Sequence, residues 1–303
     1  MKQGMCKVVV LSAAIWWSMA CMVAIAKEPG ASSVPFKSGQ IRIEYEKPLN
    51  PAHQEIYERM KERRVLEQFR EFLSPVRLPG PLLLKFAGCD GVSNAWYEPG
   101  DHAVTVCYEY IDEILTNVPK ETTAAGVTPD DAFVGPGVEV FLHEIAHALF
   151  DMLKVPILGR EEDAADQIAS YLLLQLGKQE SRRTVTGVAY MYGREAKVQS
   201  ADMKHFADAH GLPAQRFYNL LCIAYGADPA LFADLVEKKY LPEARAEWCG
   251  EEYRQVAYAV SKLIVPHMDQ NLRKQVKAKK WLKPAAPADA KPGSAPAAIP
   301  SPK

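Results

Sequence analysis

The sequence predicts an α+β protein, in which a small antiparallel or mixed sheet is followed by a mainly helical region. Three observations support this fold class. Segments with the two-residue alternation of strands lie between residues 40 and 108. From residue 109 onward, apolar residues recur mostly at helical spacing. The chain of 303 residues is 48% hydrophobic, which is enough for a substantial core, and its net charge of -1 indicates no nucleic-acid partner.

The N-terminus has the features of an export signal. Residues 1–26 run from a lysine-bearing start through an apolar stretch to Ala-Ile-Ala at 24–26, the small-residue pattern that signal peptidase cleaves. We therefore expect an exported protein, periplasmic or secreted, with no membrane span after cleavage. An uncleaved membrane anchor and lipid attachment at Cys21 are the alternatives. Residues 27–39 are expected to form a flexible leader before the fold begins at residue 40.

The first half of the fold is expected to contain the strands. Residues 40–45 alternate as a strand does, and residues 81–87 and 103–108 are also predicted as strands. Apolar positions between about 53 and 73 recur as in a helix. The segment between the last two strands is dense in turn residues, with a tight turn at 98–101.

The second half is expected to be helical. The predicted helices cover about 109–118, 137–154, 161–176, 200–210, 213–225, 229–239 and 251–274. Pro136 and Gly137 mark the expected start of the second of these helices. Residues 276–303 consist mainly of Ala, Pro, Lys and Ser, so we expect a disordered tail there. Residues 40–275 are interpreted as a single domain.

Four cysteines remain once the signal is removed: Cys89, Cys107, Cys222 and Cys249. An even number of cysteines in an exported chain indicates disulfides. Three pairings are possible, and we favour Cys89 with Cys107 and Cys222 with Cys249 because each pair lies within one local region. No two cysteines form a C-x-x-C motif, which argues against a zinc knuckle.

The segment FLHEIAHALFDMLK, residues 141–154, places two histidines and a glutamate among apolar residues. In a helix His143 and His147 leave the same face one turn apart, so both can bind one metal ion. Glu144 is rotated by about 100° from His143 and flanks the metal, where a general base belongs. The alternative is a solvated stripe that matches the motif by chance, but such a stripe more often carries Lys or Arg.

A catalytic zinc site normally has three protein ligands, so a third ligand is needed. The next helix opens with three acids, Glu161, Glu162 and Asp163, which the helix dipole alone could explain. The dipole does not explain Asp166. Because Glu162 lies closest to the face of Asp166, we predict that Glu162 binds one zinc ion per chain together with the two histidines. Asp166 would then orient a histidine, and Glu161 would contribute little.

This combination resembles the gluzincin metallopeptidases, which carry H-E-x-x-H on one helix and E-x-x-x-D on a later one. A narrower resemblance links the chain to a family of exported bacterial proteins classed as metallopeptidases of unknown function. It covers about residues 40–270 and rests on four segments: HEIAHALFDMLKVPILGREEDAADQ, CDGVSNAWYEP, FADAHGLPAQRFYNLLCIAYGADP and RAEWCGEEY. It implies a zincin-like metallopeptidase fold, a Zn²⁺ cofactor and a peptide or protein substrate.

The resemblance also implies a mechanism. Glu144 would accept the proton of a zinc-bound water as that water attacks a peptide carbonyl. Gluzincins stabilise the oxyanion with a downstream His or Tyr, and the candidates here are His205, His210, Tyr218 and Tyr225. We favour His210, which lies beside turn residues, and rank Tyr218 second, although His210 is equally well explained as a surface residue. The strand at 82–87 would hold an extended substrate.

Three functions are therefore compared. The leading hypothesis is an exported zinc metallopeptidase. The main alternative is a zinc-containing binding or scaffold protein of the cell envelope with little or no turnover, and the third is a metal-free structural domain of the envelope. Glu144 favours the enzyme, because a scaffold needs no base beside its metal. No oligomeric state is predicted.

Overall fold

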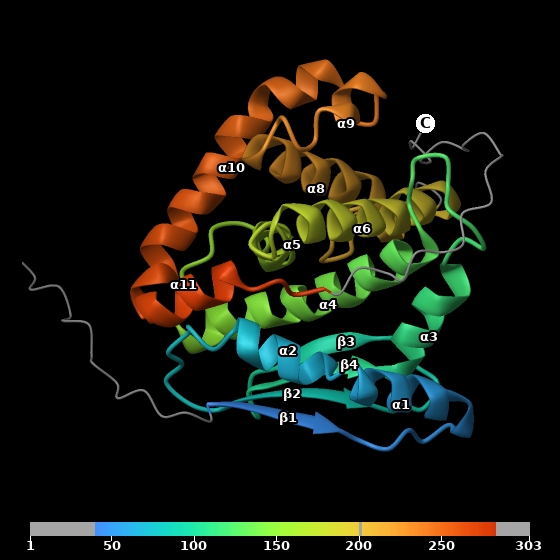
Figure 1. The fold of residues 1–303 in the computed structure, drawn as a ribbon, viewed down its shortest axis with the longest axis vertical. Coiled ribbons are helices and arrows are strands. Elements are labelled where there is room, and N and C mark those ends of the chain that lie inside the picture. The colour runs from blue at the N-terminus through green and yellow to red at the C-terminus, as the bar shows by residue number, and fades with distance from the viewer. Residues whose placement is uncertain (1–39, 200–201, 283–303) are drawn as a thin grey trace, which may run out of the picture. The chain divides into compact units, whose positions relative to one another are not determined.

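The computed structural model describes residues 40–199 and 202–282. They form an α+β fold, as predicted, with a four-stranded mixed sheet and a mainly helical remainder (Figure 1). The predicted signal peptide and leader lie outside the described residues, as does most of the predicted tail. No helix within the described ranges is long and apolar enough to cross a membrane.

The sheet has the strand order β1-β2-β4-β3. Its strands are β1 (Ile41–Tyr45), β2 (Leu82–Ala87), β3 (Ala95–Glu98) and β4 (Ala103–Cys107). β2 pairs in parallel with both β1 and β4, whereas β3 pairs antiparallel with β4 at one edge. The predictions of β1, β2 and β4 are confirmed. β3 was not predicted, because its four residues lie between turn-rich segments that dominate the local pattern.

Helices cover one face of this sheet. Leu82, Leu84 and Phe86 of β2 are buried in the core, whereas Arg42 and Glu44 of β1 are exposed on the opposite face. The helices therefore pack on the face that carries the apolar residues of β2.

The segment predicted as one helix over 53–73 contains two. After a short 3-10 turn, η1 (Pro51–His53), come α1 (Gln54–Glu62) and α2 (Val65–Phe72). They are separated at Arg64, whose φ of 54° lies in the left-handed region, so a right-handed helix cannot continue through it. The apolar periodicity continues across this break because both helices pack against the same core.

The long helix α4 (Pro129–Met152) lies between the sheet on one side and α5 and α6 on the other (Figure 1). Thr128 caps its N-terminus by accepting a hydrogen bond from the Asp131 amide at 3.0 Å, and Pro129 occupies the first turn. The predicted start at Pro136 and Gly137 is therefore wrong, and Pro136 lies inside the helix.

The ring of Phe141 fixes α4 against the sheet side of the core. Phe141 is fully buried. Its ring centroid lies 4.6 Å from that of Phe69 on α2 and 5.0 Å from that of Phe86 on β2. These aromatic contacts position the helix that carries both predicted metal-binding histidines.

The other helices are α3 (Tyr108–Asn117), α5 (Glu161–Leu173), α6 (Lys178–Val198), α7 (Met203–Phe206), α8 (Pro213–Ala227), α9 (Asp234–Glu237), α10 (Glu243–Leu263) and α11 (Gln270–Ala278), with a 3-10 turn η2 (Val265–His267). α5 and α6 pack on α4, and α8 packs on α5, α6 and α10. The helices predicted at 200–210 and 229–239 are reduced to α7 and α9. The one predicted at 251–274 begins earlier and is divided into α10, η2 and α11.

The sequence pattern missed α6 altogether, and its contact with α4 explains why a helix forms there. Two glycines let the two helices approach closely. A Cβ added to Gly187 would lie 1.9 Å from the carbonyl oxygen of Asp131, and one added to Gly135 would lie 2.6 Å from that of Thr184. Gly has a low intrinsic helix propensity, so this helix depends on tertiary packing that the local sequence does not reveal.

The predicted domain boundary at residue 275 falls inside α11, and the structure describes the chain up to residue 282. Beyond that helix, Trp281 is buried, and its ring centroid lies 5.4 Å from that of Phe72 on α2. The C-terminal segment up to residue 282 therefore packs on the N-terminal helices.

Both disulfides are present in the predicted pairing. Cys89–Cys107 connects the segment after β2 with the end of β4, and Cys222–Cys249 connects α8 with α10. Two disulfides are typical of proteins that fold outside the reducing cytoplasm.

Candidate metal centre

The C-terminal half of α4 presents His143, Glu144 and His147 to the first turn of α5. His143 is 4% exposed and Glu144 8% exposed, while His147 is half-buried. α5 begins at Glu161, so Glu162 and Asp166 share one helical face as predicted. The two helices are joined by the mostly exposed loop 153–160 and pack against each other.

Three ligand-type atoms converge between these helices. The Nε2 atom of His143 lies 3.0 Å from Glu162 Oε2 and 3.2 Å from His147 Nε2, and His147 Nε2 lies 3.3 Å from Glu162 Oε2. Tetrahedral zinc with ligands at about 2.0–2.1 Å would separate its ligand atoms by about 3.3 Å. The triangle formed by the three predicted ligands therefore fits a zinc-sized cation with only small adjustments.

Each imidazole near this triangle has a carboxylate at its other nitrogen. Nδ1 of His143 lies 2.9 Å from Asp166 Oδ1, as the prediction for Asp166 requires. Nδ1 of His147 lies 2.8 Å from Glu161 Oε1. The expectation that Glu161 contributes little thus conflicts with its position, because its flexible side chain reaches His147 although its helical face differs from that of Glu162. Such carboxylate partners fix the tautomer and orientation of metal-binding imidazoles.

His210, the favoured oxyanion donor, lies at the same site. Its Nε2 is 3.0 Å from Glu162 Oε2, and its ring stacks on His143 with centroids 5.8 Å apart. Its Nδ1 lies 3.3 Å from Asp208, whose Oδ1 also accepts the His210 backbone N–H at 2.9 Å. The ring is half-exposed, so it can meet a molecule that enters from solvent.

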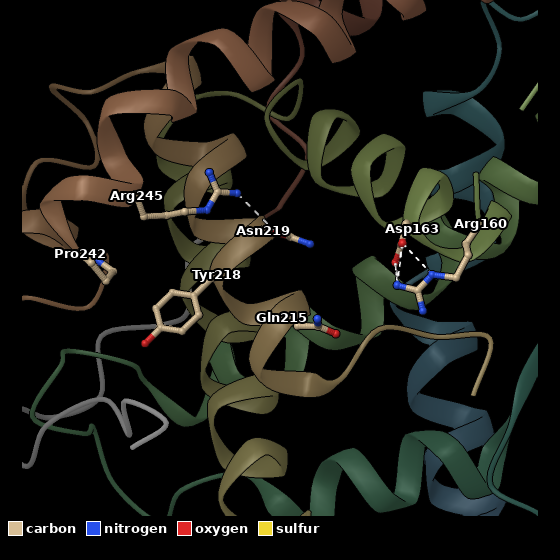
Figure 2. A pocket seen from close by; sticks show the side chains of 7 residues that line it. All are labelled: Arg160, Asp163, Gln215, Tyr218, Asn219, Pro242 and Arg245. Carbon is tan, nitrogen blue, oxygen red and sulfur yellow. Dashed lines mark hydrogen bonds and ion pairs between the residues drawn. The ribbon is translucent and has the colours of Figure 1, made fainter. Parts of the chain in front are cut away.

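Tyr218, the second candidate donor, lies elsewhere. It follows Arg216 by two residues on α8, so it faces nearly the opposite side of that helix. It lines an open pocket of about 430 Å³, where its ring points away from Asp163 (Figure 2). Its ring packs edge-on against Phe217, and no hydrogen bond or ring contact joins it to the ligand triangle within the described part of the chain.

Glu144, the predicted general base, follows His143 on α4 and is buried. Its carboxylate accepts no hydrogen bond from any residue within the described ranges, in contrast to the other acids of the site. Burial raises the pKa of this carboxyl above its usual value. A buried carboxylate with unused lone pairs is suited to accept a proton from a bound reactant.

Hydrogen bonds with carboxylates raise the pKa of both His143 and His147. Burial opposes protonation of His143, but its hydrogen bonds with Asp166 and Glu162 outweigh burial and raise its pKa to about 10. Hydrogen bonds with the three imidazoles hold the pKa of Glu162 well below its usual range. A metal ion that binds the Nε2 atoms must therefore displace protons.

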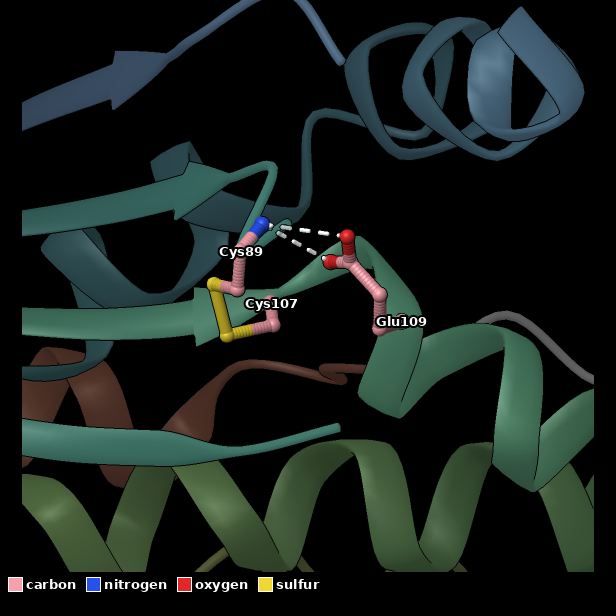
Figure 3. Close-up of side chains that lie close together, drawn as sticks. All are labelled: Cys89, Cys107 and Glu109. Carbon is pink, nitrogen blue, oxygen red and sulfur yellow. Dashed lines mark hydrogen bonds between the residues drawn. A yellow bond between two sulfur atoms is a disulfide. The ribbon is translucent and has the colours of Figure 1, made fainter. Parts of the chain in front are cut away.

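A second cluster of ligand-type residues lies at the end of the sheet: Cys89, Cys107 and Glu109 (Figure 3). The two sulfurs are joined in a disulfide. The Glu109 carboxylate accepts the backbone N–H of Cys89 at 3.1 and 3.0 Å and that of Gly91 at 3.2 Å. These bonds tie the loop after β2 to the first turn of α3, and they occupy the atoms that a metal would need.

The strand expected to hold a substrate, 82–87, cannot do so. It is β2, which has a hydrogen-bonded neighbour on each side. The strand at the sheet edge near α4 is β3, which packs against that helix. The Tyr97 hydroxyl of β3 donates a hydrogen bond to Asp151 near the end of α4 at 2.8 Å.

Three residues that pack behind His143 were not predicted to take part in the site: Glu139, Tyr192 and Arg216. Arg216 on α8 donates two hydrogen bonds to Asp166. Tyr192 on α6 donates one to Glu139 on α4 at 2.7 Å. No local spacing connects these helices. The one sequence signal for a role of Arg216 is that it lies within a segment that carries the family resemblance.

A family model described as "DUF4344: Putative metallopeptidase" matches residues 45–264 of the chain. Members of a metallopeptidase family use a metal ion to act on peptides or proteins. Neither a curated protein nor a solved structure matches the chain.

Proposed function

The chain belongs to this metallopeptidase family, and on that premise we propose that it is an exported zinc-dependent hydrolase of peptide bonds. One observation carries the proposal: Nε2 of His143, Nε2 of His147 and Oε2 of Glu162 lie 3.0–3.3 Å from one another. Two imidazoles and a glutamate form one of the common ligand sets of catalytic zinc. The two disulfides and the signal-like N-terminus support export.

A zinc ion held by these three residues would supply a Lewis acid that polarises a carbonyl and makes a water molecule more acidic. Glu144 accepts the proton of the attacking water and then delivers it to the nitrogen of the departing amine. Its raised pKa, caused by burial, moves the carboxyl toward the range in which it can both accept and return a proton.

His210 supplies the second donor to the developing oxyanion. Asp208 lies at its Nδ1, which leaves Nε2 directed toward Glu162 and the ligand triangle. A donor aimed in advance at the place where charge develops stabilises the transition state more than the substrate. We assign no role to Tyr218, because it faces the other side of α8.

The substrate would bind as an extended strand along the free edge of β3. That edge is the one next to α4, the helix that carries Glu144. Backbone hydrogen bonds to an edge strand hold a peptide without demanding a particular sequence, so side-chain preference would come from the surrounding surface.

Digestion of a peptide library by the mature, disulfide-bonded protein tests this proposal. We expect cleavage that a chelator abolishes and added zinc restores, together with about one zinc per chain by elemental analysis. Absence of bound zinc would refute the metal centre. Zinc without any chelator-sensitive cleavage would instead favour the envelope scaffold.

A further inference from the structure

Arg216 of α8 forms a bidentate ion pair directly behind His143. Its Nε donates to Asp166 Oδ2 at 2.7 Å and its Nη2 donates to Oδ1 at 2.6 Å. Two parallel bonds fix the plane of the carboxylate as well as its position. Asp166 Oδ1 also lies 2.9 Å from Nδ1 of His143. One oxygen therefore connects the guanidinium to the imidazole.

The guanidinium is itself held from two further helices. Its central carbon lies 4.5 Å from the ring centroid of Tyr192 on α6. Its Nη2 lies 3.7 Å from Oε1 of Glu139 on α4, the oxygen that also accepts the Tyr192 hydroxyl. The Arg216 and Asp166 side chains are 18% and 16% exposed, so water competes little for these bonds. Arg216 is thus fixed relative to α4, α5 and α6.

We propose that Arg216 is a positioning residue that acts through Asp166 to set the ring orientation of His143. The inference rests on the proposed metal centre, but it assigns a role to a helix that supplies no ligand. Asp166 could rotate about its side-chain bonds if only one oxygen were held. The two bonds from Arg216 prevent this rotation, so one carboxylate oxygen stays 2.9 Å from Nδ1 and Nε2 stays directed toward Glu162.

A simpler account is that Arg216 only compensates the charge of buried Asp166. The two accounts differ for lysine, which keeps the positive charge but offers no planar fork of donors. In the Arg216→Lys variant, charge compensation would persist whereas the orientation of the carboxylate would be lost.

We therefore expect Arg216→Lys to weaken zinc affinity by about tenfold to a hundredfold, measured by competition with a chromophoric chelator. The visible absorption bands of the cobalt-substituted protein should also shift, because they report ligand geometry. If this variant does not fold, Arg216→Gln enters the same two assays. Because glutamine also removes the charge, wild-type zinc affinity in Arg216→Gln would overturn the inference, and a shifted cobalt spectrum is the result expected if the ring orientation of His143 changes.

Arg183→Lys is the matched control. Arg183 on α6 also binds two acids of α4, with its Nε 2.6 Å from Asp131 and its Nη2 2.7 Å from Asp130. Its side chain is 15% exposed, close to the value for Arg216. Its partner Asp131 lies about three turns before His143 on α4. Its replacement should lower thermal stability while zinc affinity and the cobalt spectrum stay as in the wild type.

Wild-type zinc affinity and an unchanged cobalt spectrum in the Arg216 variant would overturn the inference, as would an equal loss of affinity in Arg183→Lys. The proposed function would stand in both cases, because the wild type would still bind zinc. If the wild type binds no zinc, the proposed function fails and the inference fails with it.

Discussion

The cluster of His143, His147 and Glu162 differs from the cluster at the end of the sheet in what its metal-ligating side chains already bind. At the end of the sheet, the sulfurs of Cys89 and Cys107 bond each other, and Glu109 accepts backbone N–H groups. Between α4 and α5, carboxylates occupy each Nδ1, while two Nε2 atoms and one Oε2 atom face one another. Residue type alone therefore does not define a metal site. The arrangement of the atoms matters too, and only in the α4–α5 cluster do two Nε2 atoms and a carboxylate oxygen face one another.

The largest expected effect is on zinc content, which should differ between variants of the α4–α5 cluster and variants of the cluster at the end of the sheet. His143→Ala removes one of the three converging atoms and should abolish stoichiometric zinc binding, whereas Glu109→Gln should retain about one zinc per chain. Elemental analysis after dialysis measures both variants. Unchanged zinc in both His143→Ala and His147→Ala would show that the α4–α5 cluster is not the metal centre.

Glu144→Gln tests whether the same cluster is catalytic. The substitution preserves shape and removes the base, so turnover of a cleaved peptide should fall by about 10²–10⁴-fold while zinc content is unchanged. Steady-state kinetics on the best library peptide provides the measurement. Full activity in the variant would exclude Glu144 as the base.

The Cys89–Cys107 disulfide, in the cluster at the end of the sheet, should affect stability but not zinc binding. It closes a loop between residues 18 apart, so Cys89→Ser combined with Cys107→Ser should lower the free energy of unfolding by about 2–4 kcal/mol. Denaturant titration monitored by circular dichroism measures the loss. Zinc content should remain at the wild-type value; a drop at a temperature where the variant is folded would mean that the two clusters are coupled.

Glu161→Ala gives a smaller effect within the metal cluster. Loss of the carboxylate 2.8 Å from His147 Nδ1 should weaken zinc affinity by about tenfold. Asp163→Ala is the control, since Asp163 also lies in the first turn of α5 but pairs with Arg160. Equal zinc affinities of the two variants would show that the contact of Glu161 with His147 has no role in binding.

The smallest expected effect is the pH dependence of the stability that Glu109 contributes. Burial alone would raise the pKa of Glu109, but its backbone hydrogen bonds outweigh burial and lower it below 4.5. A carboxyl whose pKa is lower in the folded state adds stability above its unfolded pKa and loses it as pH falls through the folded value. The stability difference between wild type and Glu109→Gln should therefore shrink from about pH 6 to about pH 3. A difference that stays constant in denaturant titrations over that range would contradict this assignment.

The candidate ligands could be predicted from sequence because they follow helical spacing. His143 and His147 are four residues apart on one helix, and so are Glu162 and Asp166 on the next. Local periodicity places such pairs on one face without knowledge of the fold. Glu161 shows the limit of that reasoning, since its contact with His147 depends on side-chain reach and on the packing of α5 against α4.

Features that depend on contacts between distant segments could not be predicted in the same way. Arg216 lies 50 residues from Asp166 in the sequence, and no pattern in either helix predicts that they pair. The start of α4 is a different case. Thr128, Pro129 and the acids that follow form a recognisable N-terminal helix signal, whereas the prediction placed the start at Pro136 and Gly137. Pro136 is tolerated within α4, which packs against both the sheet and α6.

The contact of Gly135 with Gly187 has a mechanical consequence. Since no side chain separates the backbones of α4 and α6 there, the two helices cannot slide past each other without a clash, and they should move as one rigid body. His143 and His147 belong to α4 and therefore to this rigid body. Glu162 belongs to α5, which follows a mostly exposed loop. Thermal motion should therefore change the distance between Glu162 on α5 and the histidines of α4 more readily than the distance between the two imidazoles.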